Sequence, residues 1–184
     1  MRIIGGEARG RTIEAPAGRN TRPTLDRIRE NMFNMIQSDV PGSRVLDLFA
    51  GSGALSLEAV SRGAESAVMA DYDRKAVETE KRNIEKLRYA DRTRVLHCDW
   101  RQAAEILRKE NARFDLVFLD PPYAMEDLRE VFRALIPLIE EESLIILEHE
   151  AGRQYTVADG FDEVKSRAWG FCAMSIYRLV RTGE

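Results

Sequence analysis

The sequence has little cysteine, histidine or tryptophan, with two residues of each in a chain of 184. Two cysteines, Cys98 and Cys172, cannot build a disulfide framework, and we expect both to be buried, reduced thiols. His97 and His149 stand apart without the spacing of a metal site, so no metal is expected. No apolar run approaches the ~20 residues that span a bilayer, and the N-terminus lacks the apolar core of a signal peptide. We therefore expect a globular cytoplasmic protein, by default a monomer.

The small net charge of −3 conceals an uneven distribution of charge along the chain. Residues 1–30 carry seven arginines against four acidic side chains, whereas the remaining residues carry 21 basic and 27 acidic ones. An asymmetry of this kind indicates a polyanionic partner, and arginine suits bidentate phosphate recognition and base stacking. The alternative is a solvated, arginine-rich surface.

From residue 44 onward, apolar runs alternate with segments of helical periodicity. Near-continuous apolar strands between helices predict a parallel α/β sheet with right-handed crossovers. The charged stretch 78–88 is expected to be a solvated helix face. Two final runs, joined by a tight turn, predict an antiparallel hairpin. The expected strands cover about 44–49, 66–71, 93–98, 114–119, 143–149, 161–168 and 171–181, and the expected helices about 53–62, 74–88, 100–110 and 126–139.

An extension over residues 1–40 precedes the α/β domain, which we place at residues 41–184. The segments 2–4 and 11–13 are expected to pair as a small hairpin or irregular arm. A helix is expected to begin near Pro23, with Thr24 as its N-cap, and to end at Pro41-Gly42.

The segment Val45 to Leu55 predicts a strand, a glycine turn and a helix. Gly51 and Gly53 allow the backbone to approach a ligand closely. A dinucleotide fingerprint has a third glycine where this chain has Ser56, which disfavours a nicotinamide oxidoreductase. Asp71 follows the glycines by about 20 residues, at the end of another apolar stretch, where a carboxylate can hold the two hydroxyls of a ribose.

The tetrapeptide Asp120-Pro121-Pro122-Tyr123 follows the apolar run 114–119. Two prolines make a stiff loop whose carbonyls are available as acceptors. A carboxylate and a carbonyl can hold the two hydrogens of an exocyclic amine, and an aromatic ring can stack on its base. The motif therefore indicates chemistry on the amino group of a nucleobase.

The chain resembles the class I S-adenosylmethionine-dependent methyltransferases and, more narrowly, the RsmD family, over essentially its whole length. The segments that carry the resemblance are Met1-Arg2-Ile3-Ile4-Gly5-Gly6, Arg9-Gly10-Arg11, Arg22-Pro23-Thr24, Asp26-Arg27, Arg29-Glu30, Asp47 to Leu55, and Asp120 to Tyr123. The resemblance implies a Rossmann-like, mostly parallel seven-stranded sheet with a C-terminal antiparallel hairpin. It also implies methyl transfer from S-adenosyl-L-methionine to the N2 amine of a specific guanine in 16S rRNA. The family often has Glu at the position of Asp71, and either carboxylate can hold a ribose.

The implied cofactor site lies beyond the carboxyl ends of the strands. Its residues are Asp47 toward the ammonium group, Phe49, Gly51, Ser52 and Gly53 beside it, Asp71 on the ribose, Tyr72 on the adenine, Asp99 on the adenine amine, and Trp100 nearby. Asp120 and the Pro121 carbonyl would accept from the guanine amine, with Pro122 in the same loop and Tyr123 stacked on the base. The expected phosphate contacts are Arg9, Arg11, Arg22, Arg27 and Arg29.

Several alternatives stay open at this point. Turn or cap chemistry is the structural alternative for Asp71 and Asp99, and a place in the core is the alternative for Tyr72 and Trp100. The acceptor is naked rRNA or an assembled or partly assembled small ribosomal subunit. The same motif also serves adenine N6 in DNA or a protein amide. A rival of another class is an inactive methyltransferase fold that binds RNA.

Overall fold

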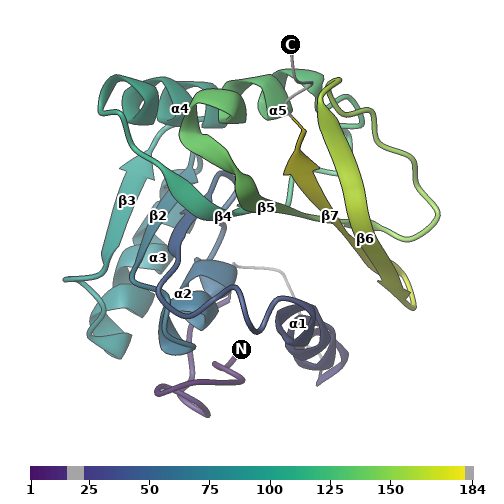
Figure 1. Cartoon of the computed structure of the whole chain (residues 1–184). Coiled ribbons are helices and arrows are strands. Elements are labelled where there is room, and N and C mark those ends of the chain that lie inside the picture. Colours follow the sequence, from purple (N-terminus) through teal and green to yellow (C-terminus); the bar gives the residue numbers. More distant parts are fainter. Residues whose placement is uncertain (16–22, 181–184) are drawn as a thin grey trace.

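The computed structural model describes residues 1–15 and 23–180, with the side chains of 23 and 24 left out. A seven-stranded sheet with the order β3-β2-β1-β4-β5-β7-β6 forms its centre (Figure 1). The five strands from β3 to β5 are parallel, and β7 runs antiparallel to both β5 and β6. This confirms the predicted fold. The strands are β1 Arg44–Asp47, β2 Ser66–Asp71, β3 Thr93–His97, β4 Phe114–Leu119, β5 Ile139–Glu150, β6 Phe161–Trp169 and β7 Cys172–Leu179.

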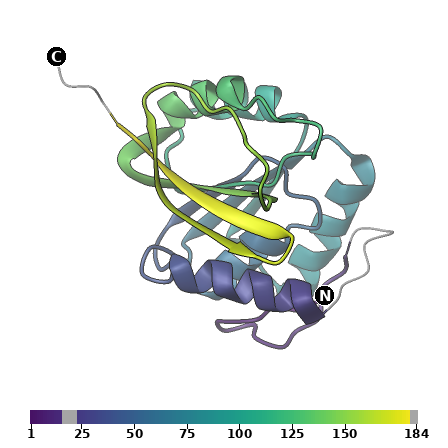
Figure 2. The same ribbon diagram turned by 90° about the vertical axis from the view of Figure 1, so that its right-hand side faces the viewer.

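Helices cover both faces of the sheet (Figures 1 and 2). Helices α4 and α5 lie on one face, and α1, α2 and α3 lie on the other. None of the described helices is long and apolar enough to cross a membrane. The helices are α1 Pro23–Met35, α2 Ala54–Ser61, α3 Arg74–Leu87, α4 Trp100–Lys109, α5 Arg129–Leu135 and the short 3₁₀ helix η1 Ile136–Leu138.

The expected helix over 126–139 is the element that differs most from the prediction. Its α-helical part begins only at Arg129, and its last turn is the 3₁₀ helix that contains Pro137. Proline lacks the N–H that an α-helix needs, so the last turn tightens and leads directly into β5. That strand is longer than expected, because it starts at Ile139. The helix α1 ends at Met35 rather than at Pro41-Gly42, and its expected cap Thr24 lies outside the described side chains.

The core consists of two hydrophobic clusters, one on each face of the sheet. We call them the first cluster, against α1, α2 and α3, and the second cluster, against α4 and α5. Side chains alternate between the faces along a strand. Phe118 of β4 belongs to the first cluster and Leu119 to the second. By the same alternation, three carboxylates lie on the side of the first cluster: Asp47 and Asp71, which end β1 and β2, and Asp120, which follows β4.

The N-terminal arm, residues 1–15, packs against α2 and α3 and contributes to the first cluster. Its two halves meet at one antiparallel bridge, Arg2 to Thr12, where an irregular arm or small hairpin was expected. Gly6 has a φ of 76°, and a Cβ there would lie 1.8 Å from the Ser61 carbonyl oxygen. Glycine at this position therefore allows the arm to lie directly on the end of α2.

Glu58 of α2 anchors the arm from below. Its carboxylate has no exposed surface and accepts from the backbone N–H groups of Ile4 at 2.9 Å and Gly5 at 2.7 Å. Arg62 donates to it at 2.8 Å, and Arg29 of α1 forms an ion pair with it at 3.7 Å. Burial lowers the pKa of Arg29, and the charge of Glu58 opposes that shift. One carboxylate thus joins the arm, α1 and α2.

We expect Glu58→Gln to lower the free energy of unfolding by about 3–5 kcal/mol, because it removes the buried charge that pairs with both Arg29 and Arg62. Urea denaturation would measure the loss. The matched control is Glu78→Gln, which removes an exposed pair with Arg74 and should cost about 0.5 kcal/mol or less. Equal losses in the two variants would contradict the anchoring role of Glu58.

Candidate active site

The glycine turn between β1 and α2 is built on two positive φ angles, 57° at Gly51 and 78° at Gly53. A Cβ at Gly53 would lie 2.9 Å from Met69 Sδ, so this glycine is required for packing against β2. At Gly51 a Cβ would meet nothing within 4 Å. The backbone at Gly51 therefore faces open space, where a ligand can approach closely.

Asp47 ends β1 and is buried beside this turn. Ser56 Oγ donates to its Oδ2 at 3.1 Å, and the Phe49 N–H also donates to the carboxylate. Within the described chain, Oδ1 has no hydrogen-bond partner. Burial raises the pKa of Asp47 to about 7; Ser56 opposes the rise, and repulsion from Asp120 adds to it. A buried carboxylate oxygen that lacks a donor is suited to a cationic ligand group.

Asp71 ends β2 and holds the glycine turn in place. Its Oδ2 accepts from the Gly51 N–H at 2.9 Å, and its Oδ1 accepts from the Asp73 N–H at 2.9 Å. Turn chemistry, the alternative for this residue, is therefore present. Each oxygen keeps a second lone pair, so the contact with a ribose stays a prediction.

Two buried polar residues of α3 were not predicted. Glu80 packs under the turn, since a Cβ at Gly53 would lie 3.5 Å from its Cγ, and neither of its oxygens has a partner among the described residues. Burial raises the pKa of Glu80 to about 9, and repulsion from Asp47 and then Asp71 adds to it. Asn83 donates from Nδ2 to the carbonyl oxygens of Ser52 and Glu14, both at 3.0 Å.

The expectation of a solvated face over 78–88 is therefore wrong for these two residues. A signal was present, because Glu80 and Asn83 lie at helical spacing with Val77, Ile84 and Leu87 on the buried stripe of α3. A polar side chain on an apolar stripe indicates an internal partner. Ser52 itself is buried, and its carbonyl links the glycine turn to Asn83.

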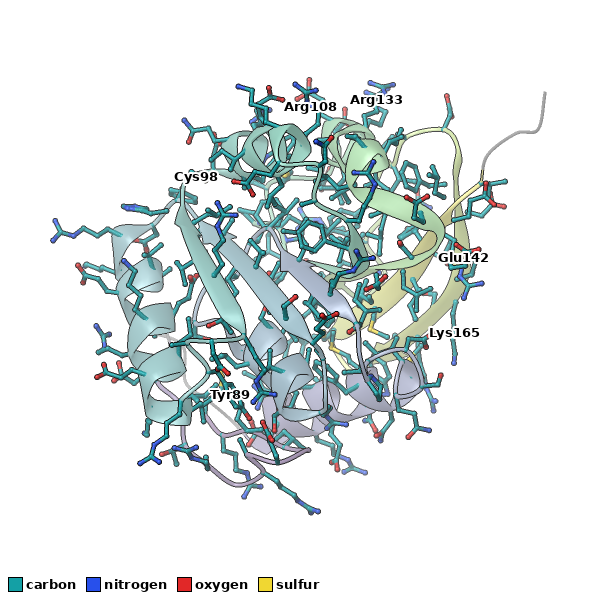
Figure 3. All side chains as sticks on the ribbon, turned by 60° about the vertical axis from the view of Figure 1, so that its left-hand side comes forward. Tyr89, Cys98, Arg108, Arg133, Glu142 and Lys165 are labelled. Carbon is teal, nitrogen blue, oxygen red and sulfur yellow. The ribbon has the colours of Figure 1, made fainter. Side chains whose placement is uncertain are left out.

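The residues expected near the adenine, at the ends of β2 and β3, fit the predicted cofactor site less well than the glycine turn does. Asp99 caps α4, with its Oδ1 accepting from the Gln102 N–H at 2.9 Å. Trp100 lies in the second cluster, with the Arg101 guanidinium 4.4 Å from its ring centroid, so it is a core residue here. A groove between α4 and α5 exposes its edge, on the layer where Figure 3 labels Arg108 and Arg133. Tyr72 is 72% exposed.

Phe49 and the two cysteines are the remaining residues for which the sequence made a prediction near the strand ends. Phe49 is partly buried against the second cluster, on the far side of the sheet from Glu80. Both cysteines are free, as expected, but only Cys172 is buried and Cys98 is partly exposed. Figure 3 shows Cys98 at the end of β3.

The loop after β4 begins with a half-buried Asp120 and a buried Pro121. The Pro122 carbonyl accepts from the Met125 N–H at 2.8 Å, which closes a turn. Tyr123 is 61% exposed and is accessible to a stacking partner. In the parallel pair of β1 and β4, Asp47 is the Cα partner of Phe118, so the loop and the glycine turn lie at the same end of neighbouring strands.

The arginines of the extension divide into different groups. Arg9 and Arg27 are exposed, and Arg22 lies outside the described residues. Arg11 donates to the Leu87 carbonyl at 3.2 Å and to the Lys86 carbonyl, at the end of α3. Arg29 is 8% exposed and pairs with acidic side chains. The prediction that Arg29 contacts phosphate is corrected. Arg29 lies on the apolar stripe of α1, so its side chain points into the core.

The open space at Gly51 and the partnerless Asp47 Oδ1 fit S-adenosylmethionine, which carries positive groups next to a ribose. Together with the sheet order and the loop after β4, they define a class I S-adenosylmethionine-dependent methyltransferase.

Comparisons with known proteins give the family. A family model described as "Conserved hypothetical protein 95" matches residues 1–178. The chain is 37% identical to "Putative rRNA methyltransferase YlbH" of Bacillus subtilis, over 97% of this chain and 98% of that protein. It is 34% identical to "Ribosomal RNA small subunit methyltransferase D" of Escherichia coli, over 100% of this chain and 92% of that protein. The solved structure of "Putative methyltransferase yhhF from Escherichia coli" has a TM-score of 0.82 at 30% identity and covers 99% of both chains. The chain belongs to this family, the RsmD family.

Cofactor affinity should depend on pH through Asp47. Its protonated form, which prevails below about pH 7, offers no charge to a cation, so the affinity should rise with pH by up to about tenfold per unit until the carboxyl is ionised. Glu80 stays protonated over this range. Calorimetric titration with S-adenosylmethionine from pH 6 to pH 8 would measure the rise.

Asp47→Asn should bind the cofactor more weakly and remove the pH dependence. The control Asp162→Asn, an exposed residue of β6, should keep it. A rise of the same size in Asp47→Asn would assign the titration to another group.

Proposed function

We propose that this methyltransferase modifies the exocyclic N2 amine of a guanine in the 16S rRNA of the small ribosomal subunit. The observation that carries the proposal is the loop from Asp120 to Tyr123. This loop follows β4, which lies next to β1 in the sheet, and the charge of Asp120 repels that of Asp47. Relatives named as rRNA methyltransferases support an rRNA acceptor. Arg9 and Arg27, exposed on the extension, support a polyanionic one.

The residues of the glycine turn would hold the cofactor. Asp47 would face the ammonium group, with the backbone from Gly51 to Gly53 beside it. Asp71 would accept from the ribose hydroxyls through its remaining lone pairs, and Asp99 would accept from the adenine amine through the oxygen that does not cap α4. When bound, S-adenosylmethionine supplies a methyl group that its sulfonium has already activated.

The residues of the loop act on the acceptor. The guanine N2 lone pair is delocalised into the ring, so the amine is a poor nucleophile. Asp120 and the Pro121 carbonyl would accept its two hydrogens and favour a pyramidal nitrogen whose lone pair points at the methyl group. Tyr123 would stack on the base once it is splayed out of its RNA context. Positioning therefore supplies much of the rate, and Asp120 takes the proton late.

We further propose a partly assembled small subunit as the acceptor, met in the cytoplasm by a monomer. An arginine-rich arm that sits on a folded domain is suited to a surface made of both protein and RNA. Phosphate contacts from the arm would set affinity and register, while the loop selects the base.

Tritium transfer from labelled S-adenosylmethionine to small-subunit rRNA, to particles and to duplex DNA tests the proposal. The label should be recovered as N2-methylguanosine from RNA. Asp120→Ala should lower the rate by about 10²–10³-fold, the range for one group aimed at the reacting atoms. Asp127→Ala is the matched control, since Asp127 lies in the same loop in an exposed pair with Arg129.

The other outcomes of this assay would each support one of the alternative functions. Label in adenine of DNA would keep the fold and the cofactor but replace the acceptor. No label with any acceptor, together with RNA binding, would identify an inactive binding module.

RNA binding should weaken steeply with salt, because arginines displace counterions from phosphates. Arg9→Ala and Arg27→Ala should each reduce the slope of log K against log salt by about 1. Arg74→Ala, at an exposed position of α3, should leave the slope unchanged. Filter binding at several salt concentrations would measure the slopes, and unchanged slopes in all variants would mean that the arm is a solvated surface.

A further inference from the structure

Asp120 has a second carboxylate as its neighbour in the sheet. In the parallel pairing of β4 and β5, Phe118 is the Cα partner of Ile146, and both side chains belong to the first cluster. Asp120 and Glu148 each follow two residues later. Because side chains alternate along strands, Asp120 and Glu148 lie next to each other on the same face of the sheet.

The Glu148 carboxylate leans toward the edge of the sheet that carries the acceptor loop. Its Oε1 lies 3.5 Å from the Sγ of Cys172, the residue paired with Glu150 across β5 and β7. The side chain thus extends along β5 in the direction in which the strand ends. Burial raises the pKa of the Cys172 thiol, and the charges of Glu148 and then Asp120 add to the rise. The charges of both carboxylates therefore disfavour ionisation of the same thiol.

The order of the strands separates two functions along this edge. The carboxylates assigned to the cofactor lie at or just after the ends of β3, β2 and β1, and Asp120 follows β4, the next strand. Glu148 lies on β5, beyond Asp120 as seen from the cofactor. A base whose reacting amine is held at Asp120 would present its adjacent ring atom toward β5, the strand that carries Glu148. In guanine that atom is N1, which carries a hydrogen, whereas N1 of adenine is an acceptor.

We propose that Glu148 selects guanine at the acceptor site by accepting the N1–H of the base while Asp120 holds its exocyclic amine. This inference rests on the proposed function and names the residue that gives it its base specificity. The charge of Glu148 is among those that oppose the lowering of the Arg29 pKa by burial. An ionised carboxylate accepts hydrogen bonds and donates none. Such an acceptor binds the N1 edge of guanine and repels that of adenine.

Single-atom changes in the acceptor base test this selection. The probe is a small-subunit RNA fragment that carries guanine, 2-aminopurine or 6-thioguanine at the position that the wild-type enzyme methylates. 2-Aminopurine keeps the amine but has an acceptor at N1 and lacks O6. 6-Thioguanine keeps the amine and the N1–H while sulfur replaces O6, so it separates recognition of N1 from recognition of O6.

The wild-type kcat/KM should fall by about 10- to 100-fold from guanine to 2-aminopurine, as for one well-placed base contact, and by a few-fold at most for 6-thioguanine. Glu148→Gln should narrow this difference, because its amide oxygen can still accept from the N1–H of guanine while its amide nitrogen can donate to N1 of 2-aminopurine. The ratio of the two bases should then approach one. Glu142→Gln makes the same change at the other end of β5 and should keep the wild-type ratio (Figure 3).

Equal losses on both bases in Glu148→Gln would overturn the inference and leave Glu148 a structural partner of Arg29 and Cys172. A wild-type enzyme that methylates 2-aminopurine as well as guanine would overturn it without any variant, so the test does not depend on the folding of Glu148→Gln. A wild-type enzyme that methylates no guanine at all would instead refute the proposed function, and guanine selection would fall with it.

Discussion

The carboxylate of Glu58 has no exposed surface, yet it accepts hydrogen bonds from the arm and faces two arginines. A charge this deep is tolerated only because its partners are in place. The arm, α1 and α2 are therefore stable in one relative arrangement. Because α2 begins at the glycine turn, the same contact also fixes the helix onto which that turn leads. The cofactor site depends on a side chain that would not touch the cofactor.

The parallel sheet brings several carboxylates together at the carboxyl ends of its strands, an arrangement suited to a cationic ligand. Four adjacent strands supply these carboxylates: Asp71 from β2, Asp47 from β1, Asp120 directly after β4, and Glu148 from β5. Glu80 of α3 lies beneath them. Burial raises the pKa values of Asp47 and Glu80, and repulsion from neighbouring carboxylates adds to the rise in each. A sulfonium and an ammonium held at the proposed site would offset the cost of these charges, whereas the demethylated cofactor lacks the charge on sulfur. The same electrostatics would therefore favour binding before transfer and release after it.

The sequence predicted the local backbone features of the candidate site. A glycine turn after a strand, an acid at the next strand end and a proline-rich loop each fix a backbone, and the sheet topology then brings them to one edge. Burial was harder to predict, because it depends on which stripe of a helix meets the sheet. Arg29 was predicted as a phosphate contact and Glu80 as part of a solvated helix face, but both lie on apolar stripes. The shortened helix before β5 likewise depends on Pro137, whose effect on the last turn needed the neighbouring strand to be seen.

Asn83 gives the arm and the glycine turn a shared partner. One amide accepts from the Glu14 N–H and donates to the carbonyls of Glu14 and Ser52, so neither segment can shift without disturbing the other. Coupling between two sites is reciprocal. A ligand on the arm that tightens the turn raises cofactor affinity by the factor by which the cofactor raises the affinity for that ligand. The hydrogen bonds of one buried side chain thus connect the arm, where RNA is proposed to bind, to the turn, where the cofactor is proposed to bind.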